Sequence, residues 1–305
     1  MKKVAIIANR QAGGGSAAEA IRQAQRSLWG WDFEYHFPKS LSEMASICES
    51  LGSHTHEAAV IVGGDGTVNQ ALRGLIKSQV PLCVYPGGTA NDLAADLGLK
   101  KDWSQVQRLL DSRETDLIDL IEVNGVPFST VAGIGIGSIL TSEFNRKRKG
   151  SAIYSALSKR LHSHLYSFLS VKTILMRSDY HFDLRIRSDI FDEKVRSAAV
   201  FICNQSKLGG DLRVAHHRVE NDDQKFSVLV VPKCGTLRLM RGLVELRLGK
   251  MPKDFIAFST DRLSIQETQG RNIPVFGDGD ILVESSKLEF KIAPRALRIY
   301  REGNA

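Results

Sequence analysis

Glycines and one carboxylate stand together at residues 63–66 (Gly-Gly-Asp-Gly), directly after an apolar, β-branched run over residues 58–62. Glycine is needed where the main chain turns at positive φ, or where a ligand lies against main-chain N–H groups. Thr67 and Gln70 follow with the spacing of a capping box, and apolar residues then recur at helical spacing up to Ile76. A strand, a glycine loop and a capped helix predict a phosphate site, because the free N–H groups at the positive end of the helix face the loop.

Asp65 indicates what else this loop would hold. A carboxylate beside a phosphate repels it unless a cation lies between the two. Asp65 therefore predicts a metal ion, Mg²⁺ carried by a nucleotide. The simpler alternative is a turn between a strand and a helix in which Asp65 only caps the helix.

The same order of strand, glycine loop and capped helix occurs twice more. The two further cases are residues 4–8 followed by the loop 9–15, and residues 81–85 followed by the loop 86–88. Ser16 and Thr89 are the expected caps of the helices that follow these loops. Because loops at the carboxyl ends of strands in one α/β sheet converge, we expect the three loops to share one crevice.

The elements that position these loops belong to an α/β domain. Strand and helix patterns alternate from residue 1 to about 123, which predicts a doubly wound parallel sheet covered on both faces. Asn124-Gly125 then predicts a hairpin turn, and short strand-like runs dominate the sequence that follows. The second part is therefore expected to be largely antiparallel β structure.

Composition limits the class of protein. The chain has 305 residues, enough for two cores, and its 43% hydrophobic and 25% charged residues are ordinary for a globular protein. We see no apolar run that could span a bilayer, no signal peptide, and no metal or redox spacing among the four cysteines, so we expect a cytoplasmic protein. The net charge of +7 would attract nucleic acid or an anionic membrane, and composition alone does not choose between them.

Two motifs resemble those of a known family. GGDGTVNQ (63–70) and PGGTAND (86–92) resemble the signature motifs of the diacylglycerol kinase catalytic family, which includes bacterial lipid kinases, sphingosine kinases and ceramide kinases. The likeness continues at residues 118–120, 131–135, 208–210, 221–223, 278–280 and 294–297. It implies a nucleotide-binding domain over residues 1–123, similar in fold to NAD kinases and phosphofructokinases, to which residues 294–305 return. It implies a β-sandwich lipid-substrate domain over residues 124–293.

The resemblance also implies site residues. Those expected to bind ATP are Asn9, Arg10, Gln11, Ala12, Gly13, Gly63, Gly64, Asp65, Gly66, Thr67, Val68, Asn69, Gly88, Thr89 and Asn91. Asp65 would also engage the metal of the nucleotide, while Asn91, Asp92 and Asp119 would order the catalytic carboxylates.

An acidic pair would supply the general base. Asp278-Gly279-Asp280 stands where the family has Asp-Gly-Glu, although out of context it would be only a tight turn. We expect Asp278 to take the proton of the acceptor hydroxyl and Asp280 to be its partner, and the two roles could be exchanged.

A structural Mg²⁺ site is also implied. The family binds this ion through one Asp side chain and two main-chain carbonyls, which here correspond to Asp223, Glu220 and Lys225. Gln224 replaces the glycine of the family motif, so an acidic surface loop is the alternative.

A basic cluster and an amphipathic stretch form a candidate membrane-docking surface. Residues 146–149 (Arg-Lys-Arg-Lys) precede apolar and basic residues at helical spacing over 152–176. The alternative is a helix packed on the core with a solvated basic face.

Taken together, the motifs and the resemblance predict an ATP-dependent lipid kinase that contacts an anionic membrane peripherally and binds no nucleic acid. A homodimer is compatible with the sequence. The alternatives are an NAD kinase and a regulatory or nucleic-acid-binding protein that has lost catalysis.

Overall fold

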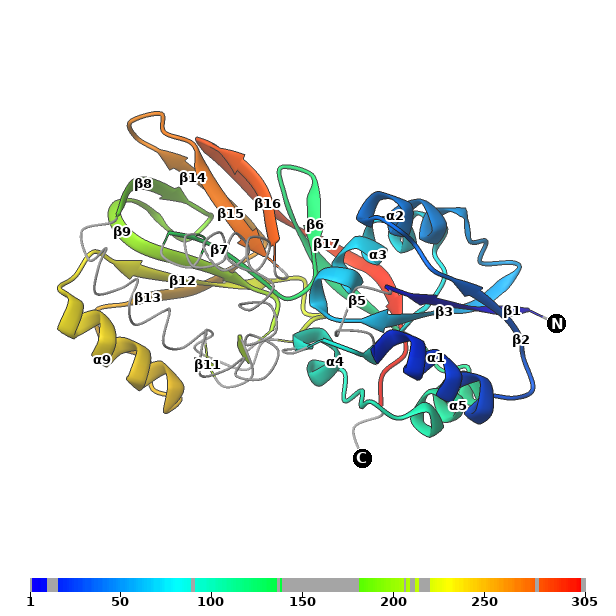
Figure 1. Ribbon diagram of the computed structural model, residues 1–305. Coiled ribbons are helices and arrows are strands. Elements are labelled where there is room, and N and C mark those ends of the chain that lie inside the picture. Colours follow the sequence, from blue (N-terminus) through cyan, green and yellow to red (C-terminus); the bar gives the residue numbers. More distant parts are fainter. Residues whose placement is uncertain are drawn as a thin grey trace. The chain divides into compact units, whose positions relative to one another are not determined.

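The computed structural model describes residues 2–9, 16–88, 91–135, 138, 181–205, 207–208, 212–213, 220–277 and 280–302 (Figure 1). The chain divides into two compact units, which are described separately. Unit 1 comprises Met1–Leu120 with Pro294–Ala305, and unit 2 comprises Ile121–Ala293.

Unit 1 alternates strands and helices along the chain. Its elements are β1 (Lys3–Ala8), α1 (Ser16–Ser27), β2 (Asp32–His36), α2 (Leu41–Ser50), β3 (His56–Gly63), α3 (Asp65–Ser78), β4 (Leu82–Pro86), α4 (Asp92–Asp96), α5 (Trp103–Ser112) and β5 (Asp116–Val123). The strand order β4-β3-β1-β2 is parallel throughout, with Lys3 opposite Asp32 and Ala59 opposite Leu82. The predicted parallel α/β region is therefore confirmed.

Helices cover both faces of this sheet. Helix α2 packs on α3 and α1 packs on α5, and Figure 1 shows the two pairs on opposite sides of the strands. The central strands are consequently buried on both faces, and every residue from Val4 to Ala8 has no exposed surface. Such strands are continuous apolar runs in the sequence because neither face meets water.

The chain leaves unit 1 through β5 and returns through β17 (Lys287–Ile299). Strand β5 pairs with β6 (Val126–Phe128) across Asn124 and Gly125, which have φ values of 48° and 82°. Positive φ at both central residues is typical of a two-residue hairpin, so the predicted turn is confirmed. At its far end, Ile299 of β17 pairs in parallel with Leu82 of β4.

Unit 2 is largely antiparallel β structure, as the sequence predicted. Its other elements are β7 (Val131–Gly135), β8 (Phe182–Arg187), β9 (Asp192–Cys203), β10 (Lys207–Leu208), β11 (Leu212–Arg213), β12 (Phe226–Pro232), α9 (Thr236–Arg247), β13 (Ile256–Thr260), β14 (Arg262–Glu267), β15 (Ile273–Gly277) and β16 (Asp280–Ser285). Strands β16-β15-β7-β9-β8-β14-β17 follow one another in the sheet, and β12 pairs with β9 and β13. A large apolar core includes Phe128, Phe226 and Phe290, and a second cluster lies beneath α9.

Candidate functional site

Three strand ends lie side by side in unit 1. Ala8 is opposite Val62 in the pairing of β1 with β3, and Gly63 is opposite Pro86 in the pairing of β3 with β4. The loops that leave these strands therefore begin next to one another, as expected from the sequence. Asn9, half-buried, opens the first loop, and the predicted ligands Arg10, Gln11, Ala12 and Gly13 lie outside the described residues.

The second and third loops are packed main chain against main chain. The Gly87 N–H donates to the Gly63 carbonyl over 2.8 Å. A Cβ built on Gly88 would lie 2.5 Å from Gly64 Cα, and one built on Gly64 would lie 2.8 Å from Gly88 Cα. None of these glycines has a positive φ. They are required because side chains would force the two loops apart.

Asp65 joins the two motifs. It is the first residue of α3, and its carboxylate accepts the N–H of Asn91 over 2.9 Å and the N–H of Asp92 over 2.7 Å. Because α4 begins at Asp92, Asp65 supplies the acceptor for the first N–H groups of a helix that lies 27 residues further along the chain. Asp65 is thus a helix cap, but it caps α4 rather than the helix it begins.

Asn91 completes the connection. Its side chain accepts the Gly88 N–H over 2.8 Å and donates to the Gly88 carbonyl over 3.0 Å. Asn91 has φ 51°, a left-handed conformation that asparagine tolerates better than most residues. The predicted capping residue of this helix, Thr89, lies outside the described residues, and Asn91 occupies the N-cap position instead.

The predicted cap of α3 is wrong. Gly64 occupies the N-cap position and makes no side-chain cap, while Thr67 lies inside the first turn and is buried. The reason is packing, since a Cβ on Gly63 would lie 2.6 Å from Thr67 Cβ. Gly66 is exposed at this helix end. The start of a 14-residue helix therefore remains without a side-chain cap beside the paired glycine loops, which fits an incoming phosphate.

Burial and hydrogen bonding act oppositely on Asp65. Burial raises the pKa of its carboxyl above the usual range, and the main-chain N–H groups of Asp92, Asn91 and Leu93 counteract part of that rise. A nearby cation would favour the charged carboxylate further. The surroundings of the Asp65 carboxylate therefore fit a bound nucleotide that carries Mg²⁺.

Two further predicted nucleotide ligands face inward. Val68 and Asn69 in α3 are both buried, so their side chains belong to the interior of unit 1. Asn69 Oδ1 has no hydrogen-bond partner within the described part of the chain. A buried acceptor without a partner is costly, which fits a donor that arrives with a ligand or with ordered water.

Asp119 holds the returning strand. It is completely buried in β5 and accepts the N–H of Arg295 over 2.7 Å. Arg295 has φ 49°, so the acceptor fixes β17 at an uncommon left-handed residue. Asp119 therefore contacts the main chain of the returning strand, and the sequence had not indicated this contact.

Most of the predicted acidic pair lies outside the described residues. Asp278 and Gly279 are outside the described residues, and Asp280 is described only in its main chain, as the first residue of β16 opposite Gly277. Their assignment as general base and partner stays a prediction.

The acidic loop before β12 forms a tight turn. Asp223 Oδ1 accepts the Lys225 N–H over 2.9 Å, and Gln224 between them has φ 60°. Gln224 thus adopts the conformation that favours glycine, so its presence has not removed the turn. No group of three His, Cys, Asp or Glu side chains that could hold a metal occurs among the described residues. The ion predicted for Glu220, Asp223 and Lys225 depends on two carbonyls and stays a prediction.

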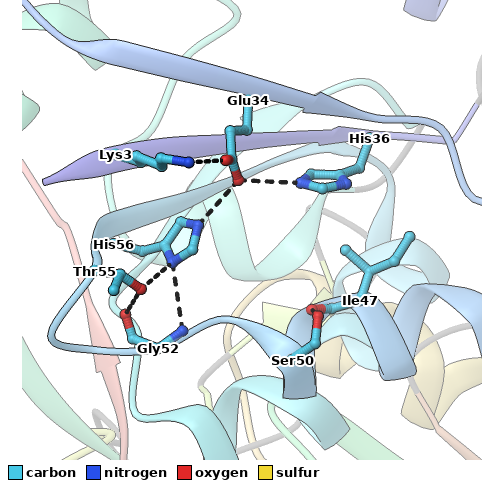
Figure 2. A network of polar contacts seen from close by, with 8 residues as sticks. All are labelled: Lys3, Glu34, His36, Ile47, Ser50, Gly52, Thr55 and His56. Carbon is cyan, nitrogen blue, oxygen red and sulfur yellow. Dashed lines mark hydrogen bonds and ion pairs between the residues drawn. The ribbon is translucent and has the colours of Figure 1, made fainter.

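A polar network lies at the opposite ends of the same strands. Figure 2 shows Glu34 of β2 between Lys3 and His56, the first residues of β1 and β3. Glu34 pairs with Lys3, with His56 Nε2 at 3.2 Å and with His36 Nε2 at 3.8 Å. His56 Nδ1 accepts the Gly52 N–H. Hydrogen bonds from Lys3 and then His56 lower the pKa of Glu34 to about 2. The network joins the starts of β1 and β3 to β2, and no pattern in the sequence indicated it.

Comparison with known proteins agrees with these motifs. Residues 3–123 match the family model "Diacylglycerol kinase catalytic domain". The chain is 27% identical over 303 residues to "Probable lipid kinase YegS-like" of Pseudomonas syringae, covering 97% of this chain and 92% of that protein. It is 24% identical over 277 residues to "Putative lipid kinase SH2167" of Staphylococcus haemolyticus, covering 87% and 85% of the two chains.

A solved structure shares the fold. A Bacillus anthracis protein described as "a putative diacylglycerol kinase" superimposes with a TM-score of 0.79 at 19% identity, over 99% of this chain and 97% of that one. Among the described residues, no helix is long and apolar enough to cross a membrane. Residues 3–123 are thus identified as a diacylglycerol kinase catalytic domain.

Proposed function

We propose that this protein is an ATP-dependent lipid kinase, which transfers the γ-phosphoryl group of Mg·ATP to the hydroxyl of diacylglycerol or a related lipid alcohol. The observation that carries the proposal is the junction at Asp65, which holds the two family motifs together at adjacent strand ends. Phosphoryl transfer needs positioning and charge neutralisation above all, and a rigid pair of glycine loops supplies the first.

The proposed nucleotide site surrounds the start of α3. Main-chain N–H groups from Asp65 and Gly66 would face the phosphates, and residues 9–13, Gly88, Thr89 and Asn91 would also bind the nucleotide. Mg²⁺ bound with ATP would neutralise phosphate charge. Asp65 would favour its presence while it holds α4 in place.

The proposed acid–base chemistry resides in the acidic pair. Asp278 accepts the proton of the lipid hydroxyl as the oxygen attacks the γ-phosphorus, and Asp280 orients Asp278. Asn91, Asp92 and Asp119 would order the catalytic carboxylates, and Asp119 also accepts the Arg295 N–H of the returning strand.

The remaining assignments follow from this function. We assign residues 1–123 with 294–305 to nucleotide binding and 124–293 to the lipid, a division supported by the two compact units. We also propose a structural Mg²⁺ at Asp223, Glu220 and Lys225, and a cytoplasmic protein that meets an anionic membrane peripherally. The basic stretch 146–149 and the helical pattern 152–176, which were predicted to dock, lie outside the described residues.

One assay distinguishes the proposal from its alternatives. The protein is incubated with γ-labelled ATP and total lipid extract, and in parallel with NAD, and the products are separated by chromatography. We expect labelled lipid. Labelled NADP would identify an NAD kinase instead, and no labelled product would indicate a protein without catalysis.

Variants of the acidic pair test the mechanism. Asp278→Ala should abolish transfer to lipid while ATP still binds, because the phosphate loops lie elsewhere in the chain. If Asp280→Ala is inactive and Asp278→Ala retains turnover, the two roles are exchanged. Defined acceptor lipids in the same assay would identify the substrate.

A further inference from the structure

Helix α9 is seated firmly in unit 2 by one of its faces. Leu239 and Leu246 on this face join Phe255 in the apolar cluster that includes Leu229 of β12. A Cβ on Gly242 would lie 2.6 Å from Phe255 Cζ, so the helix sits close to this ring. Figure 1 shows α9 (gold) beside β12 and β13.

The opposite face carries a row of exposed aliphatic side chains. Leu237 is 88% exposed, Val244 56% and Leu248 68%. Separations of seven and eleven residues place all three on one line along the helix. The described chain has five large hydrophobic side chains that are strongly exposed, and three of them lie here. A concentrated apolar row of this kind marks an interaction surface, whereas scattered single residues would not.

Basic residues flank the row. Between Lys233 and Asp254 the sequence has six basic and two acidic residues. Both acids, Glu245 and Asp254, form ion pairs with Arg238, and Glu245 also pairs with Arg241 over 2.7 Å. The flanking basic residues that are exposed are Lys233, Arg241, Arg247, Lys250 and Lys253. The surface around α9 is therefore positive, with an apolar line along its middle.

We infer that α9 docks on the surface of an anionic lipid bilayer, with Leu237, Val244 and Leu248 inserted among the lipids and the flanking basic side chains at the level of the phosphates. The inference rests on the proposed lipid kinase function, which requires access to a membrane lipid. Aliphatic residues between long basic side chains are typical of helices that lie in a bilayer interface. Protein docking surfaces are instead rich in aromatic anchors, and the row on α9 has none.

The residues of this surface differ from those of the docking segment predicted from sequence at 146–149 and 152–176. It can therefore be tested by substitutions of its own. Side chains that are mostly exposed tolerate polar replacement with little change in stability, because they bury little area in the folded chain.

The test is sedimentation of the full-length protein with vesicles. Vesicles of phosphatidylglycerol and phosphatidylcholine are compared with vesicles of phosphatidylcholine alone. We expect binding only to the anionic vesicles. The triple variant Leu237→Ser, Val244→Ser, Leu248→Ser should bind about 100-fold more weakly, since each inserted side chain contributes about tenfold or less.

Two further variants separate charge from apolar insertion. Lys250→Gln with Lys253→Gln should weaken binding about tenfold at low salt and much less at high salt, where charge is screened. Ile190→Ser is the matched control, because Ile190 is 63% exposed in unit 2 but belongs to the turn between β8 and β9 rather than to α9. This control should bind as the parent protein does.

Two results would overturn the inference. One is vesicle binding by the triple variant equal to that of the parent. The other is loss of a dimer, measured by light scattering, with unchanged vesicle binding, which would make α9 an interface between copies of this chain. The kinase proposal is tested separately, by measuring phosphoryl transfer to a short-chain lipid acceptor dissolved as monomers. The triple variant should phosphorylate this acceptor at the parent rate, and no transfer by the parent would contradict the kinase proposal alone.

Discussion

Replacement of Asp65 tests the central structural claim. In Asp65→Ala, the N–H groups of Asn91 and Asp92 lose their shared acceptor. The Gly63–Gly87 hydrogen bond and packing of the loops would remain among the contacts that hold the second family motif. We expect α4 and its loop to detach from α3 well before the rest of unit 1 unfolds.

The size of the effect follows from the two hydrogen bonds. A hydrogen bond to a charged acceptor contributes about 1.5–3 kcal/mol, and loss of an acidic helix cap about 0.5–2 kcal/mol. Burial raises the pKa of Asp65, which places these bonds toward the lower end. We expect the free energy of unfolding of Asp65→Ala to fall by about 2–4 kcal/mol. With a urea m-value of about 2 kcal/mol/M, the midpoint would fall by about 1–2 M.

Asp65→Asn separates the structural from the electrostatic role. The amide keeps one acceptor oxygen and the shape of the side chain, so we expect a loss of about 1–2 kcal/mol. It removes the charge that would attract Mg²⁺, so we expect most kinase turnover to disappear. Near-normal turnover at saturating Mg²⁺ would show that Asp65 acts only as a cap.

Urea unfolding and amide hydrogen exchange measure these effects. Exchange at Asn91 and Asp92 should accelerate by at least tenfold in Asp65→Ala. Asp102→Ala is the control, because Asp102 caps only its own helix α5 by accepting the Ser104 N–H over 2.9 Å. It should cost about 1 kcal/mol and leave exchange at Asn91 unchanged. The reasoning is refuted if Asp65→Ala unfolds within about 0.5 kcal/mol of the parent.

Three other substitutions test neighbouring contacts. Gly88→Ala places a Cβ 2.5 Å from Gly64 Cα and should lower the free energy of unfolding by about 1–3 kcal/mol and weaken ATP binding measured by calorimetry. Gly235→Ala, which has open space around it but changes the N-cap of α9, should leave ATP binding unchanged. Glu34→Gln should lower the free energy of unfolding by about 1 kcal/mol near pH 6. Because the folded pKa of Glu34 is about 2, below the unfolded value, the difference in unfolding free energy between parent and variant should shrink as the pH falls from about 5 toward 2, as measured by urea titrations. Asp119→Ala should cost about 1–3 kcal/mol in urea unfolding, since it removes the completely buried acceptor of the Arg295 N–H, and an unchanged midpoint would contradict that role.

The sequence alone determined the local order of unit 1 and the family. Residues 58–62 form a strand because an apolar, β-branched run suits burial on both faces, and the helix after it follows the 3.6-residue period. The glycine motifs identified the family because each is contiguous in the chain. These features depend on near neighbours in sequence, so they can be read without a structure.

Side-chain roles at the same motifs needed the tertiary structure. Thr67 has the spacing of a cap, yet packing against Gly63 places it inside the helix, and Gly64 takes its position. Asp65 was expected to engage a metal, with a cap of its own helix as the alternative. The structure shows that it caps α4, and its metal role stays a proposal. Asp65 and Asp92 are 27 residues apart in the chain, and the pairing of β3 with β4 brings them together. The periodicity of the sequence describes single elements and does not predict such a contact.

The same limit explains what was missed outside the motifs. The pairing of β1, β2 and β3 brings Lys3, Glu34 and His56 together, although the three are far apart in the chain. Helix α9 has apolar residues on both sides, and sequence does not tell which side is buried. Contact with Phe255 buries Leu239 and Leu246 and leaves Leu237 in water. Local propensity therefore sets the elements, while the free energy of packing between them decides which side chains remain available for function.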